Sequence, residues 1–469
     1  MSMRVGVAAA IAGAGWIALF WPGVVTFDGV DQYRQALTGD LDDWHPPIMA
    51  ATWRLLIRLG LGGSGPFFAV QTALFFTGLG LLAAALARAG RPRAGWAVLG
   101  CALFPPLASW MTCVLKDAQM IACLAAATGV TAHYRLAGRS VPGGARAAVV
   151  LLVGYAVLVR ANAAFGAVPL ALALGQWGGL TRPVARVGAA LAGIVLVVAL
   201  GGSVNHRLLG ARPSLVERTL PVFDMAGIAT LTDLPTLPGL PVATWSQARA
   251  RHCYTPVYWD VLGDETRCGA LADTLAFDRD PNLSPVQRDW LQLIAAHPLG
   301  YAEHRLLHAV SALRLLPPPR QAPAAAPYAS QPNGWGVGQP ARAAARALQP
   351  AAAAIGASPV GAPAWWLIGA FALAAALRRT PPQPARALAL GLLLSAFGME
   401  AGLLVVGIAS DLRYHLWAAV ATGLAAGLLA ACEGAPVGWG RRSALALAAG
   451  LIALAGLRIA APATWALAG

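Results

Sequence analysis

Charged residues are scarce in this chain. Only 12% of its 469 residues are charged, whereas 58% are hydrophobic, and the mean hydropathy is +0.61. A soluble protein of this length needs far more charge to cover its surface. The composition therefore excludes a soluble enzyme and predicts an all-α, polytopic membrane protein.

Lysine and acidic residues are rarer still. Lys116 is the only lysine, and 20 acidic residues stand against 34 basic ones, which gives a net charge of +14. So basic a chain could bind nucleic acid, but twelve of its arginines, from Arg91 to Arg442, lie in short links between apolar runs. Because cytoplasmic links of membrane proteins are enriched in arginine, the basicity reflects topology, and we expect no nucleic-acid partner. A P-loop and a dinucleotide-binding glycine motif are also missing.

Cysteine is limited to six residues. Four of them lie in or beside apolar runs, where they are expected to pack as small apolar side chains. The other two, Cys253 and Cys268, lie in the one large polar segment. If that segment is exported to an oxidising compartment, a disulfide between them is expected.

The apolar runs predict about eleven transmembrane helices, since a span needs roughly 20 apolar residues. The runs cover about 4–21, 66–88, 95–112, 117–134, 146–160, 162–178, 187–205, 363–377, 385–409, 412–431 and 443–461. With a cytoplasmic N-terminus, retained as an anchor, the arginine-rich links fall inside and the polar segments 22–65 and 206–362 fall outside. We therefore expect an N-terminal membrane module (1–205), an external region between the seventh and eighth spans (206–362) and a C-terminal membrane module (363–469).

The external segments carry weaker helix signals. Residues 47–62 and 301–316 have the pattern of amphipathic helices that lie at a membrane surface, and Pro46 and Pro47 would start the first of them. In the second, leucines including Leu306 share one face, and His304 and His308 lie elsewhere. Residues 317–362 are rich in proline and alanine and predict an extended strap with a short helix at 341–349.

Acids, an imidazole and aromatics gather in the first external loop. Asp28 and Asp31 are three residues apart, so they share a face in a helical turn, and Tyr33 follows them. The second polar run of the loop is Asp43-Trp44-His45-Pro46-Pro47. Two such carboxylates can provide a general base or hold a divalent cation, and they can equally be solvated loop charges. Trp44 has an alternative role at the membrane interface, and His45 can serve only to stabilise a turn.

Cations recur beside the apolar runs at the same predicted outer face. The polar residues concerned are Lys116 with Asp117, Arg160 with Asn162, Arg305, and Asp411 with Arg413 and Tyr414. A lone lysine at this level can simply extend to the interface, and Asp411 and Arg413 can form an ordinary loop pair. Guanidinium and ammonium groups also suit phosphate oxygens, and a carboxylate base beside them suits transfer of a group from phosphate.

Taken in order, these motifs resemble bacterial members of the C-type membrane glycosyltransferase superfamily, which includes protein mannosyltransferases and lipid A aminoarabinose transferases. The motifs that carry the resemblance are Asp28 to Tyr33, Asp43 to Pro47, Lys116-Asp117, Arg160 to Asn162, His297 to Arg305, and Asp411 to Tyr414. The resemblance implies a polytopic protein of the bacterial inner membrane whose active site faces the periplasm. It also implies a polyprenyl-phosphate-linked sugar as donor and a lipid, glycan or protein as acceptor.

By the same resemblance, an acidic residue of the first external loop activates the acceptor. Asp28 is then the first candidate for the base, with Asp31 as the second carboxylate and His45 as a further catalytic candidate. Lys116, Arg160, Arg413 and Arg305 are candidates for binding the donor phosphate. No cofactor is firmly expected; a divalent cation on Asp28 and Asp31 is left open.

Other functions remain compatible with the sequence. A transporter or flippase for a lipid-linked or anionic substrate would place ionisable residues at mid-membrane depth. Only Glu400 lies mid-span, either hydrogen-bonded within the bundle or lining a cavity. A non-catalytic protein of envelope-polysaccharide assembly would use 206–362 for docking. A ligase that joins a polysaccharide to a lipid would also take a polyprenyl-linked donor.

Overall fold

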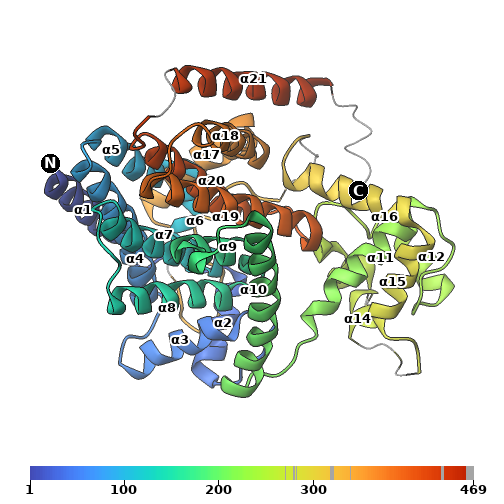
Figure 1. The fold of residues 1–469 in the computed structure, drawn as a ribbon. Coiled ribbons are helices and arrows are strands. Elements are labelled where there is room, and N and C mark those ends of the chain that lie inside the picture. The colour runs from blue at the N-terminus through green and yellow to red at the C-terminus, as the bar shows by residue number, and fades with distance from the viewer. Residues whose placement is uncertain are drawn as a thin grey trace. The chain divides into compact units, whose positions relative to one another are not determined.

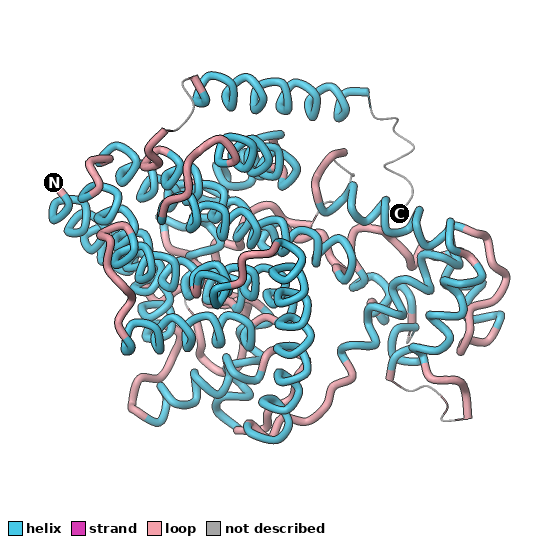
Figure 2. Tube along the Cα trace, in the orientation of Figure 1, coloured by secondary structure: helices cyan, strands magenta, loops and turns pink. Residues whose placement is uncertain are grey.

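The computed structural model confirms the helical fold class. It describes residues 1–269, 271–277, 280, 282–316, 322–338, 340–434 and 438–460. Within these ranges the backbone forms helices and three isolated bridges, with no named strand (Figure 2). The chain forms two compact units: the first holds 1–212, 324–401 and 413–451, and the second holds the described residues of 213–323, 402–412 and the chain from 452.

The first unit contains most of the helices, the long apolar ones among them (Figure 1). They are α1 (Ser2–Phe20), α2 (Phe27–Thr38), α3 (Pro47–Arg58), α4 (Gly65–Arg88), α5 (Pro92–Gly100), α6 (Pro105–Met111), α7 (Lys116–Arg135), α8 (Gly143–Val159), α9 (Ala164–Leu174), α10 (Pro183–Ser203), α17 (Ala343–Ala357) and α18 (Pro363–Leu377). The remaining three are α19 (Pro384–Val406), α20 (Leu412–Leu429) and α21 (Trp439–Ala460), parts of which belong to the second unit.

Helices α4 and α7 form the centre of the first unit. Gly78 of α4 lies against the backbone of Ala125, and Gly129 of α7 lies against the backbone of Gly78, so a Cβ at either glycine would collide with main-chain atoms. Small residues allow such close helix approach in membrane proteins. This contact fixes α7, whose first residue is Lys116.

Long apolar helices make this chain a membrane-associated protein. Four described helical segments are long and apolar enough to cross a bilayer: Ser2–Phe20, Gly65–Arg88, Pro183–Leu208 and Pro384–Val406. A bent pair raises the number to five, and the apolar helices Gly143–Val159, Ala161–Leu174, Pro363–Leu377 and Leu445–Ala460 are shorter. The predicted count of about eleven spans is not confirmed.

The straight span expected at 95–112 is interrupted. Helix α5 continues as a 3₁₀ turn over Cys101–Leu103, and α6 then starts at Pro105 at an angle of 63°. Phe104 has an extended backbone, with φ −62° and ψ 111°. The reason is Pro105, because a proline disfavours the helical conformation of the preceding residue.

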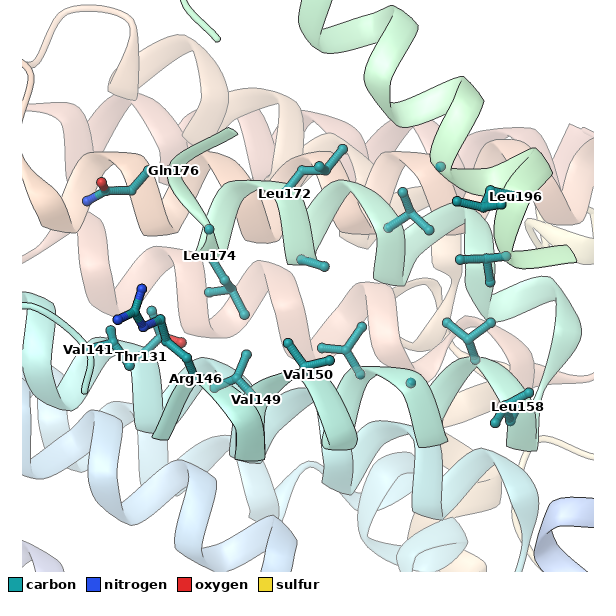
Figure 3. A pocket seen from close by; sticks show the side chains of 18 of the residues that line it. Thr131, Val141, Arg146, Val149, Val150, Leu158, Leu172, Leu174, Gln176 and Leu196 are labelled. Carbon is teal, nitrogen blue, oxygen red and sulfur yellow. The ribbon is translucent and has the colours of Figure 1, made fainter. Parts of the chain in front are cut away.

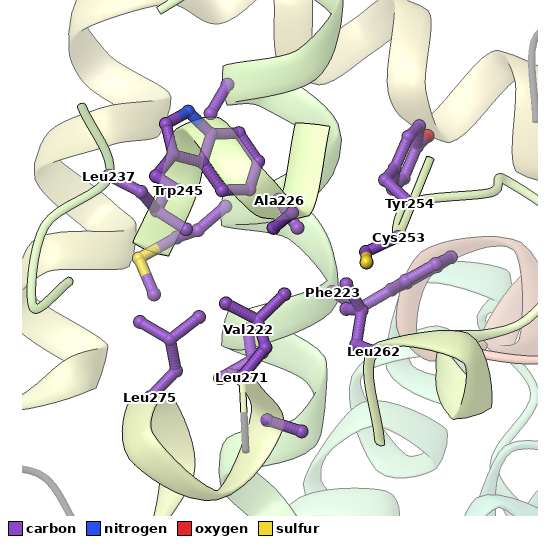
Figure 4. Close-up of a cluster of buried hydrophobic side chains, with 14 of the residues drawn as sticks. Val222, Phe223, Ala226, Leu237, Trp245, Cys253, Tyr254, Leu262, Leu271 and Leu275 are labelled. Atoms are coloured by element: carbon purple, nitrogen blue, oxygen red, sulfur yellow. The ribbon is translucent and has the colours of Figure 1, made fainter. Parts of the chain in front are cut away.

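The second unit is a small helical domain. Its helices are α11 (Thr219–Leu231), α12 (Val242–Ala250), α13 (Glu265–Cys268), α14 (Leu271–Ala276), α15 (Val286–Ala296) and α16 (Pro298–Ala312). Phe223, Trp245 and Leu275 belong to its apolar core, which Figure 4 shows in close-up. Cys253 and Cys268 also belong to this core and form a disulfide within it, with their Cα atoms 5.7 Å apart.

The helices expected in the two large polar segments form close to their predicted positions. The interfacial pattern of 47–62 becomes α3, which starts with Pro47 in its first turn, and the short helix expected at 341–349 becomes the longer α17. The pattern of 301–316 becomes α16, but its protein-facing side carries His304 and His308, whereas Leu306 is 60% exposed. The start of the strap, 317–321, lies outside the described residues.

Candidate functional site

A short backbone pairing brings two distant segments of the first unit together. Val24 donates to the carbonyl of Thr112, and Val114 donates to the carbonyl of Val24, each at 2.9 Å. Helix α2 begins three residues after Val24, and α7 begins shortly after Val114. Gly29 allows the approach, because a Cβ there would lie 3.2 Å from the carbonyl oxygen of Val114. The first turns of both helices, and with them Asp28 and Lys116, therefore lie side by side.

Asp28 lies between two cations. Its Oδ2 is 3.2 Å from Nζ of Lys116 and 3.6 Å from a terminal nitrogen of Arg413, and 18% of the side chain is exposed. Burial by itself would raise the pKa of this carboxyl group, but the charges of Lys116 and Arg413 outweigh it and hold the pKa well below the usual value of 3.8. Asp28 is thus a carboxylate at neutral pH.

His45 contacts the other side of Lys116. Its Nδ1 lies 3.2 Å from Nζ, and Gln32 donates to the carbonyl of Pro46 at 3.2 Å, which ties the histidine segment to α2. Burial and the charge of Lys116 lower the pKa of His45 to about 4. The imidazole is therefore neutral at pH 7, with Nδ1 accepting from the ammonium group. Burial also lowers the pKa of Lys116, an effect that Asp28 opposes.

A second carboxylate extends the cluster. Asp117 is 2% exposed and forms an ion pair with Arg160, whose terminal nitrogen lies 2.8 Å from one carboxylate oxygen, while Nε of Arg413 lies 4.0 Å from its other oxygen. The guanidinium of Arg160 lies over the ring of Tyr414 at 4.0 Å. Arg413 is 5.2 Å from the same ring and 5.6 Å from that of Trp110. Aromatic faces favour cations in this geometry, so both guanidinium groups are fixed in place.

The cation–carboxylate cluster, formed by Asp28, Lys116, Asp117, Arg160 and Arg413, gathers cations around its carboxylates. Lys116, Arg160 and Arg413 contact Asp28 or Asp117, and His45 adds no charge at neutral pH. The first turn of α7 adds backbone N–H groups that have no helical partner. An anion such as a phosphate diester therefore suits this cluster.

Other candidates from the first loop lie near the cluster in sequence but have partners of their own. Asp31 accepts from Arg34 at 2.7 Å and from Gln35 at 2.8 Å, within α2. The Tyr33 hydroxyl accepts from the backbone of Gly63, and its ring packs on Trp53. The contacts of Tyr33 connect α2 to α3. Asp31 therefore bonds to residues of its own helix, whereas Asp28 contacts the cations Lys116 and Arg413.

Trp44 and Asn162 are the remaining candidate site residues of the first unit. The backbone N–H of Trp44 donates to Asp42 at 3.1 Å in the turn before His45. Asn162 lies half-buried in the 3₁₀ turn Ala161–Ala163, directly after Arg160, whose extended backbone separates α8 from α9. This break turns the Arg160 side chain toward Asp117.

Arg305 and Asp411 belong to the second unit. Arg305 pairs with Asp224 and donates to the carbonyl of Gly407 at 2.7 Å. Asp224, which is fully buried, also accepts from Trp290 and contacts Nε2 of His304, each at 2.9 Å. Arg305 is therefore part of a buried network of the second unit, a role that its sequence position did not indicate.

The described strap lies against the segments that hold the cluster. Its Ser330 hydroxyl accepts from the backbone of Val25 at 3.0 Å, and Gln331 donates to the carbonyl of Val25 at 2.9 Å. Further along, Trp110 donates to the carbonyl of Ala324 at 3.4 Å. No sequence pattern identified Ser330, because a single serine in a proline- and alanine-rich segment carries no signal.

Glu400 has a histidine partner. Its Oε2 lies 2.7 Å from Nδ1 of His415, and both side chains are buried between α19 and α20. From the sequence, Glu400 can be hydrogen-bonded within the bundle or line a cavity. The contact with His415 favours the first of these alternatives. Among the described residues, no group of three or more His, Cys, Asp or Glu side chains is placed to hold a metal ion.

No protein-family model, curated protein or solved structure matches this chain. The functional argument therefore depends on the cluster itself.

Proposed function

We propose that this chain is a membrane glycosyltransferase that moves a sugar from a polyprenyl-phosphate donor to an acceptor hydroxyl. The observation that carries the proposal is the position of Asp28 between the cations Lys116 and Arg413. A general base and a phosphate-binding pair of cations are the two elements that such a transfer needs. The resemblance of the loop motifs to C-type glycosyltransferases supports the same assignment.

The contact distances assign different roles to the ion pairs. The charged atoms of Arg160 and Asp117 are 2.8 Å apart, the shortest ion pair of the cluster, so this pair holds the site together. Lys116 and Arg413 lie farther from Asp28, at 3.2 and 3.6 Å. These two cations can exchange the carboxylate for a donor phosphate. The phosphate charge then raises the proton affinity of Asp28, which makes it a better base once the donor is bound.

The proposed reaction is a single displacement with inversion. Asp28 takes the proton of the acceptor hydroxyl, and the oxygen forms a bond to the anomeric carbon. The bond from that carbon to the phosphate oxygen breaks, and its electron pair leaves with the polyprenyl phosphate. Lys116 and Arg413 stabilise the charge that develops on this phosphate. His45, neutral and in contact with Lys116, positions the ammonium group.

We also propose the setting that this reaction requires. The protein lies in a bacterial inner membrane with its N-terminus in the cytoplasm, and the cluster faces the periplasm. The disulfide between Cys253 and Cys268 supports exposure of the second unit to an oxidising compartment.

A transporter for an anionic or lipid-linked substrate is the second candidate. The observation that favours it is the buried contact between Glu400 and His415, since acid–imidazole pairs within apolar helices occur in proton relays. This pair would couple proton movement to a substrate, whereas the transferase needs no such coupling.

The deciding experiment uses the purified protein in liposomes with a panel of radiolabelled polyprenyl-phosphate sugars and a membrane-lipid extract as the acceptor pool. Wild type is compared with Asp28→Asn and with the matched variant Asp31→Asn, one turn further along α2. Label that moves to an acceptor or to water with wild type and Asp31→Asn, but not with Asp28→Asn, supports the proposal. Transfer that survives in Asp28→Asn excludes Asp28 as the base. A folded wild-type protein that moves no label from any donor counts against a transferase.

A further inference from the structure

A large apolar groove lies in the first unit, and none of its lining residues belongs to the cluster. Its volume is about 740 Å³, and it is lined by α8, α9 and α10 (Figure 3). Most lining side chains are aliphatic, among them Val150, Leu172 and Leu196. No residue of α10 is buried, although this helix contacts α9 closely at Gly193. Protein atoms therefore leave much of the apolar space beside α10 empty.

One end of this groove is cationic. Arg135, Arg139 and Arg146 line it together with Gln176, and Figure 3 shows Arg146 and Gln176 at the end opposite Leu158. Arg139 and Arg146 are exposed, and none of the described residues that line the groove is acidic. An anionic group is therefore favoured at this end.

A second apolar cavity meets the same arginine. It has a volume of about 580 Å³ between α9, α10 and α19, and it shares Arg135 and Gln176 with the first groove. Arg186 and Arg386 add further positive charge to its lining. Two apolar cavities that meet at one cationic point are complementary in shape and charge to a ligand with two hydrocarbon chains and one anionic head group.

The length of the groove fits one leaflet of a bilayer. Arg146 and Leu158 are separated by about 18 Å of helical rise along α8, which is close to half of a hydrocarbon core of about 30 Å. The cationic end lies at the start of α8, whereas Arg160 of the cluster follows the end of α8. The groove thus has its head-group end at the opposite end of this helix from the donor cations.

We propose that the two cavities hold the acyl chains of one anionic diacyl phospholipid, whose phosphate lies among Arg135, Arg139 and Arg146. The lipid fills the space between α10 and the rest of the first unit and holds this helix in place. The site is separate from the proposed transfer reaction, since its residues do not belong to the cluster.

The test is native mass spectrometry of the delipidated protein with dioleoylphosphatidylglycerol and, as a neutral head group with the same chains, dioleoylphosphatidylcholine. Wild type should retain the anionic lipid preferentially. Loss of two charges in Arg139→Gln with Arg146→Gln should weaken its binding about 30-fold and leave the neutral lipid unchanged. Arg182→Gln, at an arginine that does not line either cavity, is the charge control.

Groove-filling variants test the acyl-chain part separately. A Cβ at Gly154 or Gly201 meets no atom within 4 Å, and both glycines line the groove, so the side chains of Gly154→Phe and Gly201→Phe start in open space and add bulk to it. Both should reduce binding of either phospholipid. Gly188→Phe on α10, also in open space but outside both linings, is the control. Equal retention of both lipids by wild type, undiminished binding in the filled variants, or displacement of the lipid by a polyprenyl phosphate would overturn the proposal.

Discussion

The carboxylate of Asp28 lies 3.2 Å from the ammonium group of Lys116, the only lysine of the chain. Arginines supply every other permanent side-chain cation, so the shape of the lysine ammonium group matters at this position as well as its charge. An ammonium group is compact and fits between Nδ1 of His45 and Oδ2 of Asp28, where a planar guanidinium would need more room. The following outcomes are expected if this arrangement performs the proposed transfer.

Replacement of Lys116 should impair donor binding. Lys116→Gln removes one of the two cations that face Asp28, and we expect the KM for the lipid donor to rise by about tenfold or more. Lys116→Arg should bind the donor little better than Lys116→Gln, because a guanidinium group does not fit between His45 and Asp28. Donor-dependent transfer rates measure both effects, and Arg212→Gln, which alters an exposed pair with Asp40, is the control. Full activity of Lys116→Gln would remove Lys116 from the donor site.

Arg413→Ala should weaken donor use and change the partner set of both carboxylates. Arg413 contacts Asp28 and Asp117, so its loss removes a phosphate-binding cation and the charge that links the two acids. We expect kcat/KM for the donor to fall by about 10²-fold. Isothermal titration with a polyprenyl phosphate should show weaker binding in parallel. Unchanged binding with reduced turnover would assign Arg413 to the transition state alone.

Asp117→Asn should destabilise the first unit. The variant leaves Arg160, which is 8% exposed, without its charged partner. Breaking a buried ion pair in this way costs about 3–5 kcal/mol of folding free energy. Asp40→Asn breaks the exposed pair with Arg212 and should cost at most about 1 kcal/mol. Thermal unfolding in detergent compares the two variants, and equal melting temperatures would contradict a structural role of the Asp117–Arg160 pair.

Stability should depend on pH through His45. Its pKa is lowered from 6.5 to about 4 by burial and by Lys116. Between these values the unfolded chain binds a proton that the folded chain does not, so stability falls as the pH decreases from about 6.5 to about 4. The total contribution is about 3 kcal/mol. Asp28 acts in a lower window, because its folded pKa lies below 3.8. In His45→Gln, the free energy of unfolding should therefore change less between pH 7 and pH 4 than it does in wild type.

The sequence predicted much of the local structure and less of the assembly. The helix after Pro46-Pro47 and the apolar helices followed from periodicity and proline position, which are local properties. The contact between Asp28 and Lys116 depends on a backbone pairing of Val24 with Thr112 and Val114. Two short loop segments that pair this way leave no periodic signal, so only their separate polar motifs could be identified.

Arg305 illustrates the limit on assigning a cation from its type alone. It was grouped with Lys116 because both are cations at the same predicted level of the membrane. Its buried partner Asp224 belongs to α11, far away in sequence, and no pattern pairs the two. Glu400 shows the same limit, since its partner His415 lies on the next helix and no sequence pattern pairs the two.

The pairing at Val24 uses peptide groups and not side chains. The two helix starts are consequently held in register by atoms that every residue except proline possesses, and substitutions at Val24 or Val114 need not disturb it. The geometry of the cluster can therefore persist while the surrounding sequence drifts. Distant relatives of this chain should be recognisable by an acid four residues after one such extended segment and a cation at the helix start after the other, even where no continuous motif survives.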